Sequence, residues 1–405
     1  MPVTCRLPFR LTYCLSSIIT LVALFNSAVL TAKDLPVFSP EDVFEIEYAS
    51  DPRVSPDGSQ VAYVRVSMDI MTDRARRAIW VVDTDGTNHR PLVSGQGNFS
   101  SPRWSPSGDR LAYLSSTEGK TQLFVAWLDA GETARVTSLP QSPRGIVWSP
   151  DGEQIAFTRL VPAAPPMLAT MPDKPKGATW AEPATVVDKM TFRVDGGGYL
   201  PSGSEQVFVV PAHGGTPRQL TSGDFPISGA IAWSPDSQSI IFSSNRRDDA
   251  EYHPRQSDLF AAALPTGQIT PITDTAGPEG HPVVSPNGRY LAYTQTADIR
   301  QGYNGAKLTI RDLTTSESRS LTPDFDRSVS DIQWSKDSKN LWISYTDLGV
   351  VRVAKIDLRG KLRQTDIVVG GTAIGRPYTS GSFSVGGKGR LAYTLGRDDR
   401  PADVA

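Results

Sequence analysis

The sequence predicts an all-β protein, a seven-bladed β-propeller whose last blade is incomplete. The first observation is a recurring phrase, which in its fullest form is Trp148-Ser149-Pro150-Asp151-Gly152 followed by Glu153, Gln154 and Ile155-Ala156-Phe157. Seven copies place their serines at positions 55, 105, 149, 234, 285, 335 and 384, in steps of 50, 44, 85, 51, 50 and 49 residues. A nearly constant step of about 40–50 residues is typical of propellers and solenoids, whose units stack to bury a shared core.

The second observation is the chemistry of the phrase. Pro sets φ and the following Gly supplies a positive φ, so each copy predicts a tight corner between two strands. The third observation is an apolar triplet after the corner, which suits a sheet covered on both faces, as in a propeller blade. The other triplets are Val61-Ala62-Tyr63, Leu111-Ala112-Tyr113, Ile240-Ile241-Phe242, Leu291-Ala292-Tyr293, Leu341-Trp342-Ile343 and Leu391-Ala392-Tyr393.

Composition agrees with this fold class and limits the partners. The chain of 405 residues contains 34 Gly and 32 Pro, which favours many turns over long helices. A formal net charge of −2 provides no general attraction to nucleic acid or to an anionic membrane surface. We therefore expect neither partner, and no motif in the chain indicates a cofactor.

Residues 1–32 have the pattern of a signal peptide. Arg6 and Arg10 precede a mostly apolar stretch at 11–25, and small residues run from Ser27 to Ala32. This pattern predicts a periplasmic or secreted protein with no membrane segment after cleavage. Retention of the apolar stretch as an N-terminal anchor is the alternative.

Both cysteines, Cys5 and Cys14, lie within this segment. The mature chain would then have no disulfide, no thiolate nucleophile and no cysteine metal site.

Residues 33–50 are interpreted as a lead segment with a short helix, and 51–405 as the propeller. Ser39-Pro40-Glu41-Asp42 is a typical helix start, with Ser as N-cap, Pro at the first helical position and acids in the first turn. We expect this helix to end at about Ile46.

The long step of 85 residues contains an insertion at about 160–205, between the second and third strands of blade three. Its first half carries six prolines between Pro162 and Pro183, which forbid a regular helix or central strand. Its second half, Val186 to Leu200, predicts a protruding hairpin. Loops of this length are functional or simply solvated, and the residues leave both interpretations open.

The C-terminal residues predict a blade that stops early. In blade two the third strand starts 12 residues after Leu111, and the same interval from Leu391 reaches Asp403. The seventh blade would therefore contain two strands and a fragment, with an open sheet edge and no ordinary closure of the ring. We expect a truncated product or a segment of a longer polypeptide.

Three segments carry a family resemblance. They are Ser243 to Asp249 with Ser257-Asp258-Leu259-Phe260, the insertion end Asp195-Gly196-Gly197-Gly198-Tyr199, and Gly214 to Thr221. With the corners, which TolB-like propellers share, they resemble the N-terminal propeller of prolyl oligopeptidase-family serine peptidases of the acylaminoacyl-peptidase or dipeptidyl-aminopeptidase type. The resemblance covers about residues 38–405.

The resemblance implies a propeller that caps an α/β-hydrolase catalytic domain and restricts entry to peptides. That domain is expected in cis but is absent from these residues.

A search for catalytic groups gives none. No Gly-x-Ser-x-Gly nucleophile elbow occurs, and the nearest match, around Ser384, falls on the seventh corner. His213-Gly214-Gly215 imitates an oxyanion motif but occupies a hairpin position. The histidines 89, 213, 253 and 281 are dispersed, so no metal site is predicted. The corner tryptophans are interpreted as blade core.

Charged and aromatic loop residues are the best candidates for contact with a substrate. Fixed charges near a central opening would orient a peptide terminus, and a solvated loop with internal ion pairs is the alternative. The candidates are Arg246, Arg247, Asp248, Asp249, Glu251 and Tyr252, with Arg193, Asp195 and Tyr199 in the insertion.

Two functions follow from these observations. The first is the substrate-gating propeller of an exported serine peptidase, without peptidase activity of its own. The second is a stand-alone TolB-like periplasmic propeller that binds a protein partner.

Overall fold

The structure is a computed structural model that describes residues 38–170, 172–181, 184–297, 304–371, 381–397 and 400–405. The chain divides into two compact units, Met1–Glu45 and Ile46–Ala405. The predicted signal peptide, residues 1–32, lies outside the described residues.

The described part of the first unit contains one short helix, η1 (Pro40–Glu45). It is a 3-10 helix that ends one residue before the predicted limit at Ile46. The backbone N–H of Ser39 donates to Asp42 Oδ2 at 2.6 Å, so this end of the helix is capped by an acid of the first turn.

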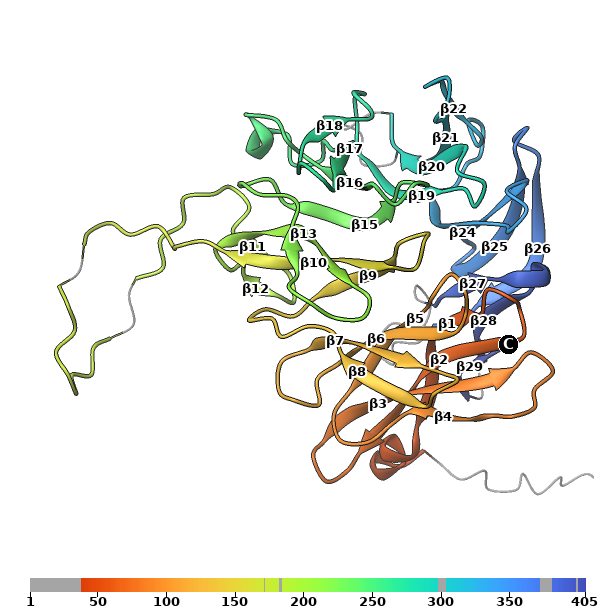
Figure 1. Ribbon diagram of the computed structural model, residues 1–405, viewed down its shortest axis with the longest axis horizontal. Coiled ribbons are helices and arrows are strands. Elements are labelled where there is room, and N and C mark those ends of the chain that lie inside the picture. Colours follow the sequence, from red (N-terminus) through yellow and green to blue (C-terminus); the bar gives the residue numbers. More distant parts are fainter. Residues whose placement is uncertain (1–37, 171, 182–183, 298–303, 372–380, 398–399) are drawn as a thin grey trace, which may run out of the picture. The chain divides into compact units, whose positions relative to one another are not determined.

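The second unit is a seven-bladed β-propeller, as predicted (Figure 1). In every sheet the strands follow chain order and run antiparallel to their neighbours. Blade one contains β1 (Glu47–Val54), β2 (Gln60–Asp69), β3 (Arg74–Asp83) and β4 (Arg90–Val93). Blade two contains β5 (Phe99–Trp104), β6 (Arg110–Ser115), β7 (Gln122–Trp127) and β8 (Glu132–Arg135). Blade three contains β9 (Arg144–Trp148), β10 (Gln154–Pro162), β13 (Gly203–Pro211) and β14 (Arg218–Gln219).

The remaining blades repeat this plan. Blade four contains β15 (Ile227–Trp233), β16 (Ser239–Ser244), β17 (Asp258–Ala263) and β18 (Ile269–Pro271). Blade five contains β19 (Glu279–Val284), β20 (Tyr290–Gln295), β21 (Lys307–Asp312) and β22 (Ser318–Ser320). Blade six contains β23 (Val329–Trp334), β24 (Asn340–Asp347), β25 (Val350–Asp357) and β26 (Leu362–Val369). Blade seven contains β27 (Phe383–Val385), β28 (Leu391–Arg397) and β29 (Arg400–Val404).

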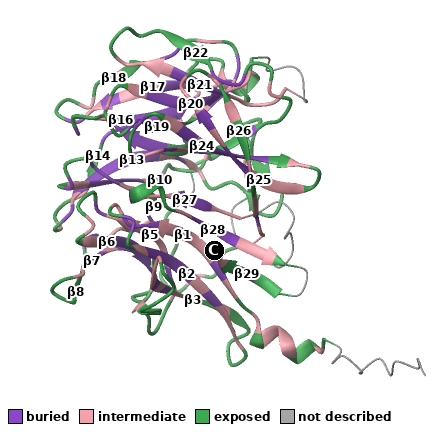
Figure 2. Ribbon diagram, turned by 90° about the vertical axis from the view of Figure 1, so that its right-hand side faces the viewer, coloured by how far each residue is buried: buried purple, intermediate pink, exposed green. Residues whose placement is uncertain are grey.

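The first strands of the seven sheets form the innermost ring. β1 contacts β5, β5 contacts β9, and the series continues through β15, β19, β23 and β27 back to β1. Most residues of the apolar triplets on the second strands are buried as predicted, with Ala62, Ala112 and Ala292 completely inaccessible. Trp342, Leu391 and Tyr393 in the last two triplets are only half-buried. Burial is concentrated on the strands, and the turns are exposed (Figure 2).

Each corner serine organises its own turn. The Ser55 hydroxyl donates to Asp57 Oδ1 at 2.6 Å, while its oxygen accepts the backbone N–H of Gln60 at 3.0 Å. The same pair recurs at Ser234 with Asp236 and at Ser335 with Asp337. The corner phrase is thus a side-chain-capped turn as well as a Pro and Gly turn.

The corner tryptophans join neighbouring blades, which adds a directional contact to their predicted role in the core. The indole Nε1 of Trp148 donates to the Arg103 carbonyl of blade two at 2.9 Å. Trp104, Trp233 and Trp334 make the same bond to the carbonyls of Arg53, Val147 and Val283 in the preceding blade. The apolar rings of each tryptophan pack in the core, while its indole N–H forms a hydrogen bond to the neighbouring blade.

The corner of blade seven lies two residues later than the sequence predicts. Val385 pairs with Leu391 as Val54 pairs with Val61 in blade one, so Gly386 takes the position of the corner serine. Ser384 is a buried strand residue, and the corner is the 3-10 turn η4 (Gly387–Gly389). The prediction was wrong because Gly386-Gly387 builds this corner without a serine or proline.

The third strand of blade seven also starts earlier than the predicted Asp403. Arg397 pairs with Arg400, whereas in blade two Ser115 pairs with Gln122, so the intervening turn is much shorter. The seventh sheet therefore contains three strands rather than two and a fragment. It remains incomplete relative to the four strands of the other blades.

Direct packing joins the first and seventh blades. β1 contacts β27, β28 and β29. The backbone N–H of Val54 donates to Ser384 Oγ at 3.0 Å, and the N–H of Gly387 donates to the Ser55 carbonyl at 3.3 Å. Within the described ranges no sheet contains strands from both blades, so the ring is closed at this seam by corner contacts.

The corner acids predict a loss of stability in acid. Hydrogen bonds, first from the Ser55 hydroxyl and then from Ser59, lower the pKa of Asp57 to about 2. Because the folded-state pKa lies below the unfolded value, this stabilisation is present above about pH 4 and is lost as the pH falls toward 2. We expect the urea midpoint to fall over this range, and to fall less steeply in Asp57→Asn. The exposed Asp173→Asn is the control, and an unchanged slope in Asp57→Asn would contradict the assignment.

Candidate functional site

The candidate residues lie on one face of the propeller. In an antiparallel four-stranded blade, the first corner and the hairpin between strands three and four share one face. The turns between strands two and three, and the connections between blades, lie on the opposite face. Both candidate segments, the insertion at 163–202 and the loop at 245–257, are turns between second and third strands, in the adjacent blades three and four.

The loop at 245–257 is held by local polar contacts. It contains the 3-10 turn η2 (Ala250–Tyr252), and the Asn245 amide donates to the His253 carbonyl at 2.8 Å. Arg247 Nε donates to Asp249 Oδ1 at 2.9 Å, and this hydrogen bond lowers the pKa of the Asp249 carboxyl. Arg247 and Asp249 therefore satisfy one another, as the solvated-loop alternative expects.

The exposed tip of this loop carries two acids and an aromatic ring. Asp248 and Glu251 are exposed, and the Tyr252 side chain is 77% exposed. An acid pair beside an exposed aromatic ring is suited to contact a cationic group that approaches from solvent.

Arg246 is packed rather than exposed. Its guanidinium lies 4.5 Å from the Phe225 ring and 5.9 Å from the Phe260 ring, and burial lowers its pKa. Its Nη1 is buried and has no hydrogen-bond partner among the described residues. Arg246 thus has a buried donor nitrogen without a partner at the base of the loop.

An insertion lies between the second and third strands of blade three, β10 and β13 (Figure 1). Pro162 pairs with Gly203 at its base. Its predicted hairpin is formed by β11 (Arg193–Val194) and β12 (Gly198–Tyr199), and Arg193, Asp195 and Tyr199 are exposed. Most of the exposed large apolar side chains of the described chain belong to this segment: Met167, Leu168, Trp180, Val187, Met190, Phe192, Val194, Tyr199 and Leu200.

The two candidate segments meet at the connection between blades three and four. Lys189 of the insertion forms an ion pair with Asp224 Oδ2 at 2.5 Å, and Ser204 donates to Asp224 Oδ1 at 2.9 Å. The next residue, Phe225, lies beneath Arg246. No hydrogen bond or ion pair between described residues joins Arg193, Asp195 or Tyr199 directly to the loop at 245–257.

Replacement of residues 163–202 by an Asn-Gly turn is expected to leave the blade folded. The β10–β13 register extends to the Pro162–Gly203 pair, which a two-residue turn can connect. Loss of an exposed ion pair costs little, so we expect the melting temperature to change by no more than about 3 °C. A much larger fall would show that the insertion is part of the structural core.

Sequence reasoning missed a repeated bulge in the innermost strands. A residue with positive φ interrupts the pairing of the first and second strands: Asp51 (φ 49°), Ser101 (55°), His281 (53°) and Asp331 (39°). Each lies four residues before a corner serine, and the first three precede a proline. The sequence signal for this bulge is a dipeptide that ends in proline at the same distance before a corner serine: Asp51-Pro52, Ser101-Pro102 and His281-Pro282.

Comparisons with known proteins agree with these features. A family model described as the TolB beta propeller domain matches residues 58–162, and one described as the dipeptidyl peptidase IV N-terminal region matches residues 197–300. Dipeptidyl-peptidase 5 of Porphyromonas gingivalis is 26% identical over 348 residues, which cover 80% of this chain and 49% of the relative. The uncharacterized peptidase YuxL of Bacillus subtilis is 30% identical over 217 residues, which cover 53% of this chain and 32% of the relative.

These matches support an N-terminal propeller of the prolyl oligopeptidase-family type. The chain spans half or less of the length of these curated relatives.

Solved structures support the propeller fold. Acylaminoacyl peptidase in complex with Z-Gly-Gly-Phe-chloromethyl ketone matches with a TM-score of 0.67 and 17% identity, over 89% of this chain and 51% of that one. The β-propeller domain of the Trilobed protease from Pyrococcus furiosus matches with a TM-score of 0.60 and 14% identity, over 89% and 92% of the two chains. The latter is described as having an open velcro topology.

The groups that imitate catalytic motifs have structural positions in the propeller. Ser384 Oγ accepts the Val54 backbone N–H, and His213 is exposed in the turn between β13 and β14. Among the described residues no group of three His, Cys, Asp or Glu side chains is arranged to hold a metal. No helix in the described part is long and apolar enough to cross a membrane.

Proposed function

We propose that this propeller gates peptide access to an α/β-hydrolase domain in an exported serine peptidase. The observation that carries the proposal is the shared face of the insertion and the loop at 245–257, connected through Asp224 and Phe225. Loops positioned by a rigid scaffold are the usual place for substrate contacts.

The chemistry of this face supports a peptide as the substrate. Asp248, Glu251 and Tyr252 would attract the N-terminal amine, while the exposed apolar side chains of the insertion would contact peptide side chains. Arg193, Asp195 and Tyr199 on the hairpin would limit the length of peptide that passes. The unpaired Nη1 of Arg246 would donate a hydrogen bond to a carbonyl oxygen of the peptide.

Two family relationships support a hydrolase domain as the partner. The curated relative from Porphyromonas gingivalis is a dipeptidyl-peptidase, and the acylaminoacyl peptidase structure is of a chain about twice as long as the matched part. We propose that the catalytic serine, histidine and acid of the present protein belong to such a domain. Export to the periplasm or outside the cell is proposed from the pattern at 1–32.

The coding sequence beyond residue 405 provides the first test. It is expected to continue, directly or after a frameshift, into a stretch with a Gly-x-Ser-x-Gly nucleophile elbow. Homogeneous protein of these 405 residues is expected to hydrolyse neither aminoacyl nor acyl-peptide chromogenic substrates. Unrelated downstream sequence together with a stable, soluble 405-residue product would refute the proposal.

A stand-alone propeller that binds a periplasmic protein is the second candidate. It is favoured by the TolB propeller model at 58–162 and by 36% identity over 81 residues, 20% of this chain, to the Tol-Pal system protein TolB of Alkalilimnicola ehrlichii. Pull-down from envelope extract separates the candidates. A single partner retained at stoichiometric amounts supports the second, and no dedicated partner supports the first.

A further inference from the structure

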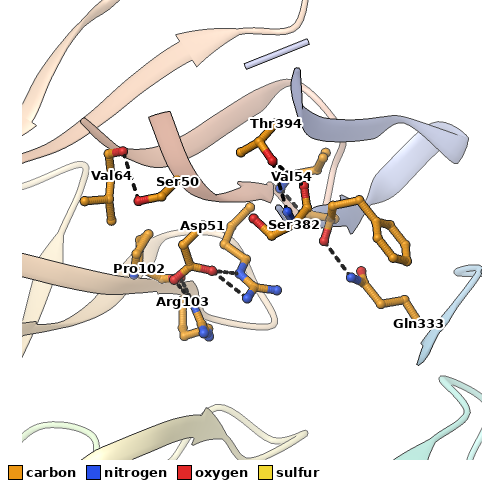
Figure 3. Close-up of polar contacts among 12 residues, drawn as sticks. Ser50, Asp51, Val54, Val64, Pro102, Arg103, Gln333, Ser382 and Thr394 are labelled. Carbon is orange, nitrogen blue, oxygen red and sulfur yellow. Dashed lines mark hydrogen bonds and ion pairs between the residues drawn. The ribbon is translucent and has the colours of Figure 1, made fainter. Parts of the chain in front are cut away.

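Two arginines from neighbouring blades converge on one carboxylate in the innermost ring (Figure 3). Arg53 of β1 forms an ion pair with Asp51 Oδ1 at 2.6 Å through Nη2 and donates to the same oxygen at 2.8 Å through Nε. Arg103 of β5 donates to Asp51 Oδ2 at 2.8 Å through Nη1. Asp51 is the bulge residue of β1, with φ 49°.

The backbone of both arginines is fixed by the tryptophan contacts between blades. The Arg53 carbonyl accepts the Trp104 indole N–H, and the Arg103 carbonyl accepts that of Trp148. Arg103 Nη1 also donates to the Pro102 carbonyl at 2.7 Å. The two guanidinium groups are therefore held in place before any ligand arrives, which reduces the entropy cost of binding.

The cluster carries one surplus positive charge. Two guanidinium groups surround a single carboxylate, and partial burial, followed by the neighbouring Arg53, lowers the pKa of Arg103. Arg53 Nη1 and Arg103 Nε and Nη2 have no hydrogen-bond partner among the described residues. The side chains of Asp51, Arg53 and Arg103 are 25%, 29% and 28% exposed, so a small solute can reach them.

The charges of the innermost strands are unevenly distributed. Arg53, Arg103 and the exposed Arg144 lie on the first strands of blades one, two and three together with two acids, Glu47 and Asp51, so these three strands carry a net charge of +1. Glu279 and Asp331 lie on those of blades five and six. This separation places the arginine pair on the positive side of the ring and favours an anion there.

We propose that Arg53 and Arg103 form a binding site for the C-terminal carboxylate of a short peptide. The remaining N–H groups present the fork geometry that guanidinium groups use to bind carboxylates, and the single surplus charge matches a monoanion. The choice of a peptide as the carrier of the carboxylate rests on the proposed function. The anion site itself requires only this chain.

A ligand-observed NMR titration of the full chain tests the proposal with a matched pair of probes, N-acetyl-Gly-Gly and its C-terminal amide. The acid is expected to bind and the amide to bind about tenfold more weakly or not at all. Arg53→Gln and Arg103→Gln keep the backbone carbonyls and are each expected to weaken binding of the acid about tenfold. Arg289→Gln, which removes an arginine paired at 3.0 Å with Asp312 in blade five, is the control and should change nothing.

Two results would overturn the proposal: equal binding of the acid and the amide, or unchanged binding in both folded variants. If a variant does not fold, phenylglyoxal modification of the unaltered chain replaces it. The acid, but not the amide, should slow modification of Arg53 and Arg103 without affecting Arg289, and absence of this protection also overturns the proposal. Carboxylate binding without a downstream hydrolase sequence would refute the proposed function and leave this site intact.

Discussion

Gly58→Ala is expected to lower the free energy of unfolding by about 3 kcal/mol, because it combines a strained φ with overpacking at the seam of the ring. Gly58 has φ +74°, and a Cβ at this position would lie 2.2 Å from the Gly387 carbonyl oxygen and 2.6 Å from its carbon. Both are backbone atoms, so relief requires blades one and seven to separate. Urea unfolding followed by far-UV circular dichroism measures the loss.

Gly86→Ala is the matched control for this variant. Gly86 lies in the same blade with φ +87°, but a Cβ there would meet no atom within 4 Å. Its substitution should therefore cost only the strain of the left-handed conformation, about 1 kcal/mol. Equal losses in the two variants would contradict a tight seam between the end blades.

The fold could be predicted because its local signals repeat. The Ser, Pro, Asp and Gly of each corner determine one turn by contacts within a few residues, as Ser55 does with Asp57 and Gln60. The prediction failed in blade seven, where Gly386 and Gly387 make the corner by close backbone approach to blade one. A contact of this kind depends on residues more than 300 positions away, so no local pattern reveals it.

The candidate site was only partly predictable for the same reason. The charged stretch Arg246 to Asp249 is visible in the sequence, but the partners of its charges are not. Arg247 is paired locally with Asp249, while Arg246 lies on Phe225 of the preceding connection. The Asp51–Arg103 pair joins residues 52 positions apart and exists because a bulge turns Asp51 toward the next blade.

Trp148→Ala is expected to destabilise the propeller by about 3–5 kcal/mol, as removal of a buried aromatic side chain usually does. Trp148 is 8% exposed and packs in the core shared by blades two and three, with the Arg110 guanidinium 5.0 Å from its ring. Its indole N–H also satisfies the Arg103 carbonyl. The melting temperature and the urea midpoint should both fall.

Two further variants separate the packing of Trp148 from its hydrogen bond. Trp148→Phe keeps most of the apolar volume but leaves the Arg103 carbonyl without its donor, which should cost about 1–3 kcal/mol. Trp180→Ala, at a 39% exposed position in the insertion, should change stability by less than about 0.5 kcal/mol. If Trp148→Phe were as stable as the unaltered chain, the bond would contribute nothing and packing alone would join the blades. If Trp148→Phe loses stability and also binds the carboxylate at Arg103 more weakly, the indole positions the arginine backbone. The substitution itself changes neither guanidinium group of the anion site.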